Sequence, residues 1–474
     1  MSADTLPGLL ERLAAERPEA AALVSLSRPP LSRAAFAAQA RRVAEGLARQ
    51  GIGPGDRVAL LLPNRPEFMV LLLALARLGA TAVPLDPRCG VEDLATLLSR
   101  ARAAAVAVSW DGGGQLPKRL SAGLELARAP LRCVIGLDAG GTATLAGLPV
   151  LPWKSLDAMP EREAVEATPE AVCLALPAGE ARLALHRQGS VTGHGRAVAT
   201  ALGLDEASAV LPALSLASPD ALAAALAALS AGARLLCQEE AGATATDSLA
   251  RAHGATHLLA GPADLAALGG MVARRPYAAL TFAGAAGPVE APGLPLREIW
   301  GSAETQGLFA LREEAGFRPV HPASLRLEGE ALAIRAPSLL AGYCGGGEAL
   351  TADGFLDTGL PAALAGESFQ LTGPRADGAF RRDGMVVSPA AVARFLARQP
   401  GVEEALAVGT PAGLLVAFIR PVADAPAEEG ILLAACREAL AAPCCPDRIV
   451  MVEQLPEAPA EAAAALALMP AAEA

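Results

Sequence analysis

The chain has 474 residues, 53% of them apolar and 19% charged, which is the composition of a globular protein and excludes a disordered chain. Its length exceeds what a single hydrophobic core usually serves, so we expect a large domain and a smaller one. The formal net charge of −11 would repel a phosphate backbone, which argues against nucleic acid as a partner.

The eight cysteines show no C-x-x-C pair and no histidine at a metal-ligand spacing. We expect them to be buried small apolar side chains in a reducing compartment, not thiolate ligands of a metal. The first thirty residues lack the apolar core and cleavage site of a secretory signal. The apolar stretch 211–236 is interrupted by Asp220 and Arg234, so a soluble, cytoplasmic protein without a membrane partner is expected.

Helical and strand patterns alternate along the first half of the chain. Apolar residues repeat at helical spacing from Phe36 to Leu47, with Gly51 as a stop, and Pro66 opens a second helix that ends near Gly79. Short apolar runs that suit buried parallel strands occupy residues 57–62, 81–84, 103–109, 235–237 and 256–260. This alternation predicts an α/β fold with a doubly wound sheet.

The pattern changes in the last third of the chain. Apolar residues alternate with polar ones on both sides of residues 328–330, which predicts a β-hairpin. Further on, Ser388 and Pro389 suit the N-cap and the first position of a helix. Strands are predicted after this helix, at 405–408 and 414–419. The segment after the hairpin therefore indicates a second, smaller module that mixes helix and strand.

Several motif strings follow one another in the order of a known family. They are Gly51–Ala59, Pro63–Asn64 with Glu67–Phe68, Gly79–Leu85, Trp300–Thr305, Ala336–Ser338 with Gly342–Tyr343, Gly354–Gly359, and Arg375 with Arg382–Pro389. Together they resemble the adenylate-forming superfamily of acyl- and aryl-CoA synthetases, peptide-synthetase adenylation domains and luciferases. The resemblance implies a large AMP-binding-like domain over residues 1–373, with doubly wound sheets and a small β-barrel-like subdomain. It also implies a small α+β C-terminal lid over residues 374–474, with a hinge near 375–378.

The reaction that this resemblance implies is the ATP-dependent activation of a carboxylic acid. The carboxylate attacks the α-phosphate of ATP, pyrophosphate leaves, and a thiol then attacks the carbonyl of the acyl-adenylate. The implied cofactors are ATP and Mg²⁺, with CoA or a phosphopantetheine carrier as acceptor. The implied partners are an acyl or aryl carboxylate or its thioester, an acyl carrier protein or partner enzyme, and a second copy in a homodimer. Such chemistry needs cations, backbone amides and hydroxyl donors around the phosphates.

The phosphate loop of the family has the form Thr-Ser-Gly-Thr-Thr-Gly-x-Pro-Lys-Gly and is followed by a helix. In this chain residues 177–184 occupy its place if the helix spans 186–202, and of the loop residues only Gly179 survives. The hydroxyls and the lysine that would surround the phosphates are missing. A rival placement at 189–196 mimics the loop with Arg196 for the lysine, and the other interpretation of this segment is the first part of a helix.

The adenine side of the family's site is better preserved. Trp300 would either stack on a purine or be a core aromatic. Glu304 is the candidate catalytic residue and the candidate Mg²⁺ ligand, although Ala303 replaces the threonine expected before it. The candidate cofactor-binding residues that the resemblance implies are Gly179, Gly284, Ala285, Trp300, Gly301, Glu304, Thr305 and Arg375.

Two residues with known roles in the family are replaced in this chain: the aspartate that binds the ribose and the lysine that stabilises the developing negative charge. The ribose-binding Asp of the Thr-Gly-Asp string is Leu360, and the C-terminal catalytic lysine falls on Ala462. Arg375 occupies the position of the hinge arginine, with Asp377 as a substitute for the hinge Asp, or is a solvated loop arginine. Removing one preorganised charge donor typically costs about 10²–10³ in rate, so these losses together bear directly on catalysis.

We therefore expect a pseudoenzyme, an adenylate-forming protein whose ATP chemistry is lost or strongly reduced and which binds an acyl group, a carrier protein or a partner enzyme. The alternative is an active acyl- or aryl-CoA ligase, or carrier-protein ligase, with an atypical phosphate site built from Arg182, Arg187 or Arg196, or from a partner's lysine. The predicted substrate pocket is lined by Leu214, Ser215, Gly284 and Ala286. The histidines are expected in loops or in the core.

Overall fold

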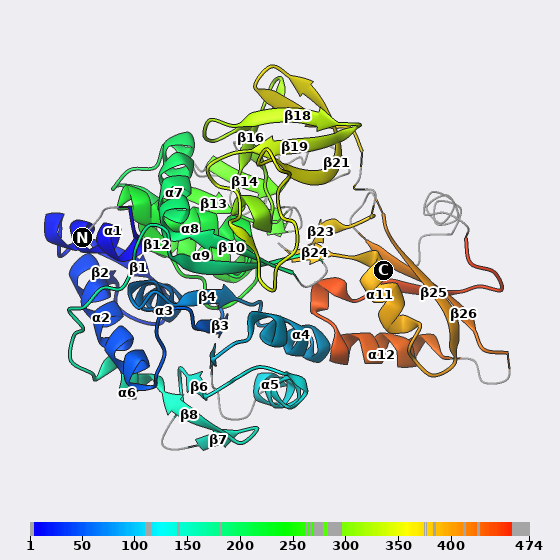
Figure 1. Cartoon of the computed structure of the whole chain (residues 1–474), viewed down its shortest axis with the longest axis horizontal. Coiled ribbons are helices and arrows are strands. Elements are labelled where there is room, and N and C mark those ends of the chain that lie inside the picture. The colour runs from blue at the N-terminus through cyan, green and yellow to red at the C-terminus, as the bar shows by residue number, and fades with distance from the viewer. Residues whose placement is uncertain are drawn as a thin grey trace.

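The computed structural model describes residues 4–109, 115–139, 143–179, 182–261, 264–265, 267–268, 278–282, 296–373, 375, 377–382, 385–410, 414–423 and 427–456. Figure 1 shows a large body of sheets and helices, beside which the C-terminal elements form a smaller lobe. Two sheets, of 13 and nine strands, organise the body, and sheets of two and three strands follow later in the chain. The predicted fold class, a large α/β part followed by a small α+β part, is confirmed.

The nine-stranded sheet contains the first strands that the sequence predicts. Its strands are β3 (Arg57–Leu61), β4 (Thr81–Pro84), β5 (Ala105–Val108), β6 (Cys133–Gly136), β7 (Ala143–Leu145), β8 (Leu148–Pro152), β9 (Val172–Ala178), β10 (Arg182–Arg187) and β20 (Gly342–Tyr343). Their order is β20-β10-β9-β4-β3-β5-β6-β8-β7, and the pairs from β9 through β8 are parallel. The apolar runs at 57–62, 81–84 and 103–109 thus form neighbouring buried strands, as expected.

The 13-stranded sheet joins a parallel part to an antiparallel part. Its strands are β1 (Ala21–Val24), β2 (Leu31–Ser32), β11 (Ala209–Pro212), β12 (Arg234–Leu236), β13 (His257–Leu259), β14 (Ala278–Phe282), β15 (Leu296–Trp300), β16 (Ala310–Glu313), β17 (Gly316–Pro319), β18 (Ser324–Glu328), β19 (Ala331–Arg335), β21 (Leu356–Ala365) and β22 (Ser368–Leu371). They follow the order β18-β19-β21-β22-β17-β16-β15-β14-β13-β11-β12-β1-β2. The predicted hairpin is β18–β19, and it belongs to the antiparallel strands that extend one edge of the sheet.

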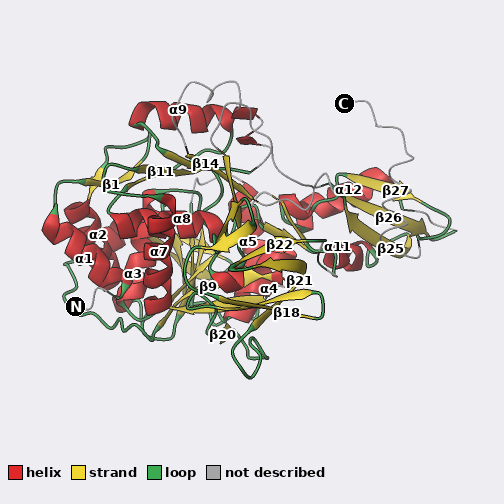
Figure 2. Ribbon diagram, turned by 90° about the horizontal axis from the view of Figure 1, so that it is seen from above, coloured by secondary structure: helices red, strands yellow, loops and turns green. Residues whose placement is uncertain are grey.

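The helices form layers around the two sheets. Helices α1 (Leu6–Glu16), α2 (Arg33–Arg49), α3 (Pro66–Arg77), α6 (Trp153–Asp157), α7 (Gln188–Leu202) and α8 (Pro219–Ala231) contribute to one apolar core together with strands of both sheets. The outer face of the nine-stranded sheet is covered by α4 (Val91–Ala101) and α5 (Gln115–Leu126). The outer face of the 13-stranded sheet is covered by α9 (Ala243–His253), which Figure 2 shows above β11 and β14.

Helix α3 explains why this part of the sequence is so apolar. All of its residues are buried, because the helix lies inside the shared core and has no side that faces water. A helix in such a place needs no polar stripe. Among the described residues, no helix combines the length and the apolar character that crossing a membrane requires.

The smaller lobe has an apolar core of its own. It contains β23 (Phe380–Arg382), β24 (Met385–Val387), α11 (Pro389–Leu396), β25 (Val402–Gly409), β26 (Leu415–Pro421), α12 (Glu429–Ala439), the 3-10 turn η3 (Ala442–Cys444) and β27 (Arg448–Met451). As predicted, Ser388 caps α11: the Ala391 N–H donates to its hydroxyl over 3.3 Å, and Pro389 takes the first position. The last strand of the body ends at Leu371. The division of the chain at residue 374 falls in the following connection and stays a prediction.

The lobe is seated on the N-terminal end of α4. A Cβ on Gly90 would lie only 1.9 Å from the carbonyl oxygen of Ala439, so only glycine permits this approach. In the next turn Glu92 pairs with Arg398 at 2.8 Å, and the Asp93 carboxylate accepts a hydrogen bond from the backbone of Ala441. The position of the lobe therefore depends on a close backbone contact as well as on exposed charges.

Candidate functional site

A cavity of about 250 Å³ lies where several of the predicted motif strings meet. Its walls come from the start of β10, the end of β15 and the turn after it, β20, the connection from β20 to β21, the first half of β21, and the connection after β22. The lining residues are Arg182, Trp300, Ser302, Glu304, Tyr343, Glu348, Ala349, Leu350, Thr351, Phe355, Leu356, Asp357, Thr358, Leu360 and Arg375. Among the described residues it brings together Trp300, Glu304, Leu360 and Arg375, which the sequence singled out.

Glu304 is presented by the turn that follows β15. The turn begins with the short 3-10 segment η2 (Ala303–Thr305), in which the Ser302 N–H donates to the Thr305 hydroxyl over 2.9 Å. The backbone of Gln306, Gly307 and Leu308 then has positive φ angles of 69°, 68° and 40°. Such a run is costly for residues other than glycine and persists only where neighbouring groups hold it.

Two buried imidazoles hold this turn from beneath. His186 Nε2 lies 2.8 Å from the carbonyl oxygen of Ala303, and His194 Nε2 lies 2.8 Å from that of Gly307. A carbonyl only accepts, so Nε2 carries the proton in both rings. Burial lowers the pKa of His186 to about 4 and that of His194 to about 3. Both rings are therefore neutral donors at neutral pH, and the expectation of core histidines is confirmed for this pair.

The far end of the turn is tied to two helices. The Leu308 N–H donates to Asp220 Oδ1 of α8 over 2.6 Å. The Gln306 amide donates to the Ser338 carbonyl over 2.9 Å and to the Ser190 hydroxyl of α7 over 2.7 Å. These contacts hold the turn, and with it the carboxylate of Glu304, in one place.

Tyr343 contacts both Glu304 and Arg182. The phenol O–H of Tyr343 donates to Glu304 Oε1 over 3.0 Å, and burial together with the Glu304 charge raises the pKa of Tyr343. The Arg182 guanidinium carbon lies 4.5 Å from the centroid of the Tyr343 ring, a cation–π arrangement. Sequence reasoning placed Tyr343 in a motif string but gave it no role, since its partners are far away in the chain.

Two paired strands flank the segment expected to replace the phosphate loop. Strands β9 and β10 pair antiparallel with Arg182 opposite Ala178, and the Arg182 Nε donates to the carbonyl of Gly179 over 3.2 Å. The hairpin leaves only residues 179–181 between the two strands. The loss of the family's phosphate loop at this place stays a prediction.

The helix after the hairpin begins later than predicted. The strand β10 continues through Arg187, and α7 starts at Gln188, not at residue 186, because pairing with β9 holds 182–187 extended. The rival placement at 189–196 is wrong, because these residues are the first turns of α7 and their backbone is helical. Arg196 forms an exposed ion pair with Asp4 at 3.1 Å, and neither Arg196 nor Arg187 lines the cavity.

Strand β21 supplies one wall of the cavity. Leu360 faces it at the place of the family's ribose Asp, while Asp357, which the sequence did not single out, brings a carboxylate to the same wall. The Thr358 hydroxyl donates to the Leu332 carbonyl over 2.7 Å and the Gly359 N–H donates to Asp357 Oδ1 over 2.8 Å. Polar groups along this wall are thus partly engaged within the protein.

Arg375 is partly exposed, and its guanidinium has several partners within the protein. Its Nη1 donates to the carbonyl of Thr358 over 2.8 Å, and its Nε and Nη2 each donate to a carboxylate oxygen of Asp377 over 3.0 Å. The ion pair with Asp377 raises the pKa of Arg375. Asp377 is therefore the ion-pair partner of Arg375, which the sequence did not predict, and Arg375 lines the cavity with its charge already balanced.

Trp300 belongs to the core and to the cavity at once. Only 7% of it is exposed, and its ring makes edge-to-face contacts with Phe309 and Phe369 at centroid distances of 5.8 and 5.1 Å. Gly301 follows it where a Cβ would lie 2.6 Å from the nitrogen of Leu308. The two interpretations of Trp300 are compatible, and stacking on a purine stays a prediction.

The predicted substrate pocket lies only partly within the described residues. Leu214 and Ser215 lie between β11 and α8; Leu214 is buried in the main core, and neither residue lines the cavity. Gly284, Ala285, Ala286 and Ala462 lie outside the described residues. The role of Thr305 also changes: its hydroxyl serves the turn described above, because it accepts from the Ser302 N–H and donates to the Ser302 carbonyl.

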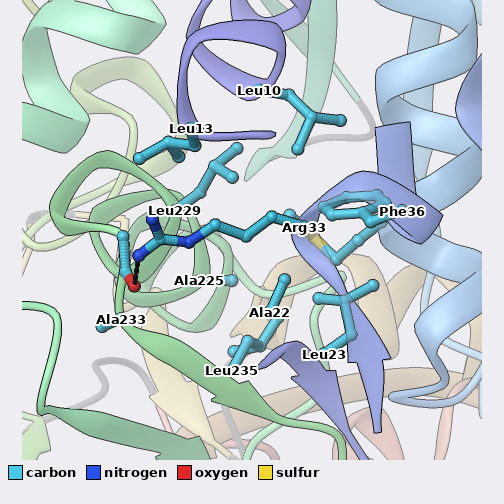
Figure 3. A pocket seen from close by; sticks show the side chains of 12 residues that line it. Leu10, Leu13, Ala22, Leu23, Arg33, Phe36, Ala225, Leu229, Ala233 and Leu235 are labelled. Carbon is cyan, nitrogen blue, oxygen red and sulfur yellow. Dashed lines mark hydrogen bonds between the residues drawn. The ribbon is translucent and has the colours of Figure 1, made fainter. Parts of the chain in front are cut away.

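A second hollow, shown in Figure 3, is too small for a substrate. Its volume is about 10 Å³, which corresponds to about one water molecule. Apolar residues surround the buried guanidinium of Arg33, whose Nη2 donates to the carbonyl of Gly232 over 2.7 Å and to Glu206 over 2.9 Å. This hollow belongs to the packing of α1, α2 and α8 around the buried guanidinium of Arg33.

The charges of the larger cavity do not fit a magnesium triphosphate. Its walls carry the carboxylates of Glu304, Glu348 and Asp357 against the guanidinium groups of Arg182 and Arg375. Within the described part of the chain, no three His, Cys, Asp or Glu side chains are arranged to hold a metal ion. A triphosphate brings several negative charges that need cations and donors, and among the described lining residues only Arg182 is a cation without a carboxylate partner.

Known proteins resemble the chain over its whole length in fold and over short segments in sequence. An oxalate–CoA ligase from Arabidopsis thaliana is 37% identical over 113 residues, 24% of this chain and 22% of that protein. A dimodular nonribosomal peptide synthase from Bacillus subtilis is 36% identical over 112 residues, 24% of this chain and 5% of that protein. The match thus spans less than a quarter of these relatives.

Solved structures show the fold. The o-succinylbenzoate CoA synthetase of Bacillus subtilis, bound with a product analogue, superposes with a TM-score of 0.80 at 20% identity and covers 96% of each chain. An amide bond synthetase from Marinactinospora thermotolerans gives a TM-score of 0.78 at 20% identity, over 95% of this chain and 97% of that one. The family model described as AMP-binding enzyme matches residues 10–352, and the model described as AMP-binding enzyme C-terminal domain matches residues 391–460. Since the first match alone covers more than half of the sequence, the chain belongs to the AMP-binding enzyme family.

Proposed function

We propose that this protein keeps the fold and the cavity of the family but has lost, or strongly reduced, the ATP-dependent activation of a carboxylic acid. In this proposal it binds an acyl or aryl group, as the acid or as a thioester, for a carrier protein or a partner enzyme. The observation that carries the proposal is the charge of the cavity, where three carboxylates face two guanidinium groups and one of those is paired with Asp377.

The distribution of basic residues supports the same proposal. The chain has only two lysines, Lys118 and Lys154, which lie on α5 and α6 at the outer side of the body. No basic residue follows Arg448, so the C-terminal segment has no group to replace the family's lysine. A preorganised cation contributes about 10²–10³ in rate in such reactions, and its absence accounts for a large loss.

A second candidate function is an active acyl- or aryl-CoA ligase, or carrier-protein ligase, with an atypical phosphate site. The position of Arg182 favours it, because this guanidinium lines the cavity beside Tyr343 and Glu304. In that case ATP and Mg²⁺ would be cofactors, and CoA or a phosphopantetheine carrier would be the acceptor. The relatives named as an oxalate–CoA ligase and a peptide synthase support both kinds of acceptor equally. Homodimer formation and a cytoplasmic location, which the eight free thiols suit, remain part of the proposal.

ATP–pyrophosphate exchange against a panel of aliphatic and aromatic carboxylic acids separates the two candidates. The panel is run with the protein alone and with an acyl carrier protein added. The proposal predicts no acid-dependent exchange above that of heat-inactivated protein, and saturable binding of an acyl thioester without ATP. Acid-dependent exchange that disappears in R182A would instead establish the atypical ligase.

A further inference from the structure

We infer that the cavity takes a ligand with one negative charge on an apolar or aromatic body, and that Arg182 is the cation that holds this charge. The inference rests on the proposed function, because it specifies the ligand of the same cavity. Two kinds of molecule share this chemistry: a free carboxylate, and a phosphodiester such as the phosphate of an acyl-adenylate. A magnesium triphosphate is the disfavoured ligand.

The charged side chains of the cavity wall limit how many negative charges a ligand can carry. Among the described lining residues, the carboxylates of Glu304, Glu348 and Asp357 outnumber the guanidinium groups of Arg182 and Arg375 by one, so an anionic ligand must be held by direct pairing with a guanidinium and not by the net charge of the cavity. Each further negative charge in a partly buried site needs a cation close by, since the low local dielectric strengthens repulsion. One anionic group can pair directly with the guanidinium of Arg182, whereas the several charges of a triphosphate exceed the guanidinium groups that the described part of the wall supplies.

Arg182 is the residue with donors to spare. No carboxylate among the described residues pairs with it, and its Nε alone is used within the protein, by the Gly179 carbonyl. Arg375 differs, because its Nη1, Nε and Nη2 are all engaged by Thr358 and Asp377. The remaining Nη atoms of Arg182 form a fork that suits a carboxylate or a phosphate oxygen pair.

Tyr343 prepares Arg182 for this role in two ways. Its ring supports the guanidinium at 4.5 Å from the centroid, so the side chain does not have to be ordered by the ligand. Its O–H donates to Glu304 Oε1 over 3.0 Å, so this carboxylate oxygen already has a partner within the protein. Tyr343 thus supports the guanidinium of Arg182 and also occupies an oxygen of the Glu304 carboxylate.

The rest of the wall indicates the body of the ligand. Trp300, Leu350, Phe355, Leu356 and Leu360 contribute ring and hydrocarbon surface to the cavity. An apolar group on the ligand covers this surface, and burial of that area supplies most of the binding free energy, while Arg182 fixes the orientation. Leu360 takes part in this wall instead of accepting from ribose hydroxyls.

The test is isothermal titration of the full-length protein with four probes: benzoate, hexanoate, the methyl ester of AMP, and magnesium ATP. The expected result is that at least one singly charged probe binds about tenfold or more tightly than magnesium ATP, and that R182A weakens this binding by about tenfold or more. R187A is the matched control, because Arg187 is exposed and does not line the cavity; it should bind like the wild type. The binding of benzoate or hexanoate, compared with that of the AMP ester, distinguishes the two sources of the charge.

Several outcomes would overturn the inference. They are tighter binding of magnesium ATP than of every singly charged probe, no binding of any such probe, and a folded R182A that binds like the wild type. Circular dichroism and thermal unfolding check that R182A is folded, and R182K, which keeps the charge without the fork, should retain part of the affinity. Outside the described side chains the sequence has basic residues only at Arg274, Arg275 and Arg381, so loss of binding in R274A/R275A or in R381A, with retention in R182A, also refutes it. If pyrophosphate exchange is absent while R182A binds normally, this inference fails and the proposed function stands.

Discussion

At the scale of single residues, the neutral imidazole of His186 connects a buried strand to the turn that carries Glu304. Its Nε2–H satisfies the Ala303 carbonyl, and burial keeps the ring uncharged. Protonation would place an unpaired charge in the core, so the unfolded chain binds the proton more readily than the folded one does. The turn is therefore secure at neutral pH and weaker in acid.

We predict a loss of stability in acid that depends on His186. Its pKa is about 4 in the folded protein against 6.5 for a solvated histidine, so its contribution is fully present above pH 6.5 and declines as the pH falls toward 4. The decline for this one group is roughly 3 kcal/mol. Urea unfolding at several pH values should show a shallower dependence in H186Q, which donates without titrating.

The control for this prediction is H253Q, at the partly exposed end of α9, which should follow the wild-type curve. Equal pH dependence in H186Q and in the wild type would contradict the assignment of the neutral donor. The contact itself was not predictable from sequence, because His186 and Ala303 are separated by 117 residues. The same holds for Tyr343, whose partner Glu304 lies 39 residues away.

At the scale of elements, the turn from Ser302 to Leu308 shows how a strained segment is held. Gly307 has a φ of 68°, and a Cβ there would lie 2.3 Å from the carbonyl carbon of Pro219 at the start of α8. We predict that G307A lowers the free energy of unfolding by more than about 2 kcal/mol, because α8 or the turn must move. The measurement is urea denaturation followed by circular dichroism.

G193A provides the matched control, since Gly193 lies inside α7 and a Cβ there meets no atom within 4 Å. Alanine is the better helix former, so this variant should be unchanged or more stable by about 0.5–1 kcal/mol. A G307A protein as stable as G193A would refute the close contact between the turn and α8.

The strands and helices themselves were largely predictable, because their apolar patterns are local. The run at 81–84 became β4 with the predicted bounds, and Ser388 with Pro389 opened α11 as expected. The start of α7 was missed by two residues, since pairing with β9 is a tertiary effect that keeps 182–187 extended. The lining of the cavity was predicted only in part from the sequence. Asp357 and Tyr343 are brought to the cavity by the pairing of strands that are apart in the sequence, which no local pattern indicates.

At the scale of the whole molecule, the contact between the small lobe and α4 depends on the absence of a side chain at Gly90. We predict that G90A separates the lobe from the body, because its Cβ would lie 1.9 Å from the Ala439 carbonyl oxygen. Small-angle scattering should give a larger radius of gyration, and hydrogen exchange should become faster in the backbone around Ala439 and Leu440. The Glu92–Arg398 pair is exposed and too weak to hold the lobe alone.

G430A is the control for the seat, since Gly430 lies on α12 with no atom near its Cβ position. An unchanged radius of gyration in both variants would show that the lobe does not depend on this contact. No lining residue of the cavity comes from the described part of the chain after Arg375. Separation of the lobe should therefore leave the affinity for a singly charged probe within about twofold of the wild type.

The central claim is that a preserved fold encloses a cavity whose charges no longer suit a triphosphate. Single-turnover reaction with the protein in excess over labelled ATP tests this claim most directly, since one acyl-adenylate per site is detected even when turnover is very slow. Across the panel of carboxylic acids, the account predicts no labelled acyl-adenylate above the heat-inactivated control. Formation of acyl-adenylate in a stoichiometric amount with any acid would contradict it.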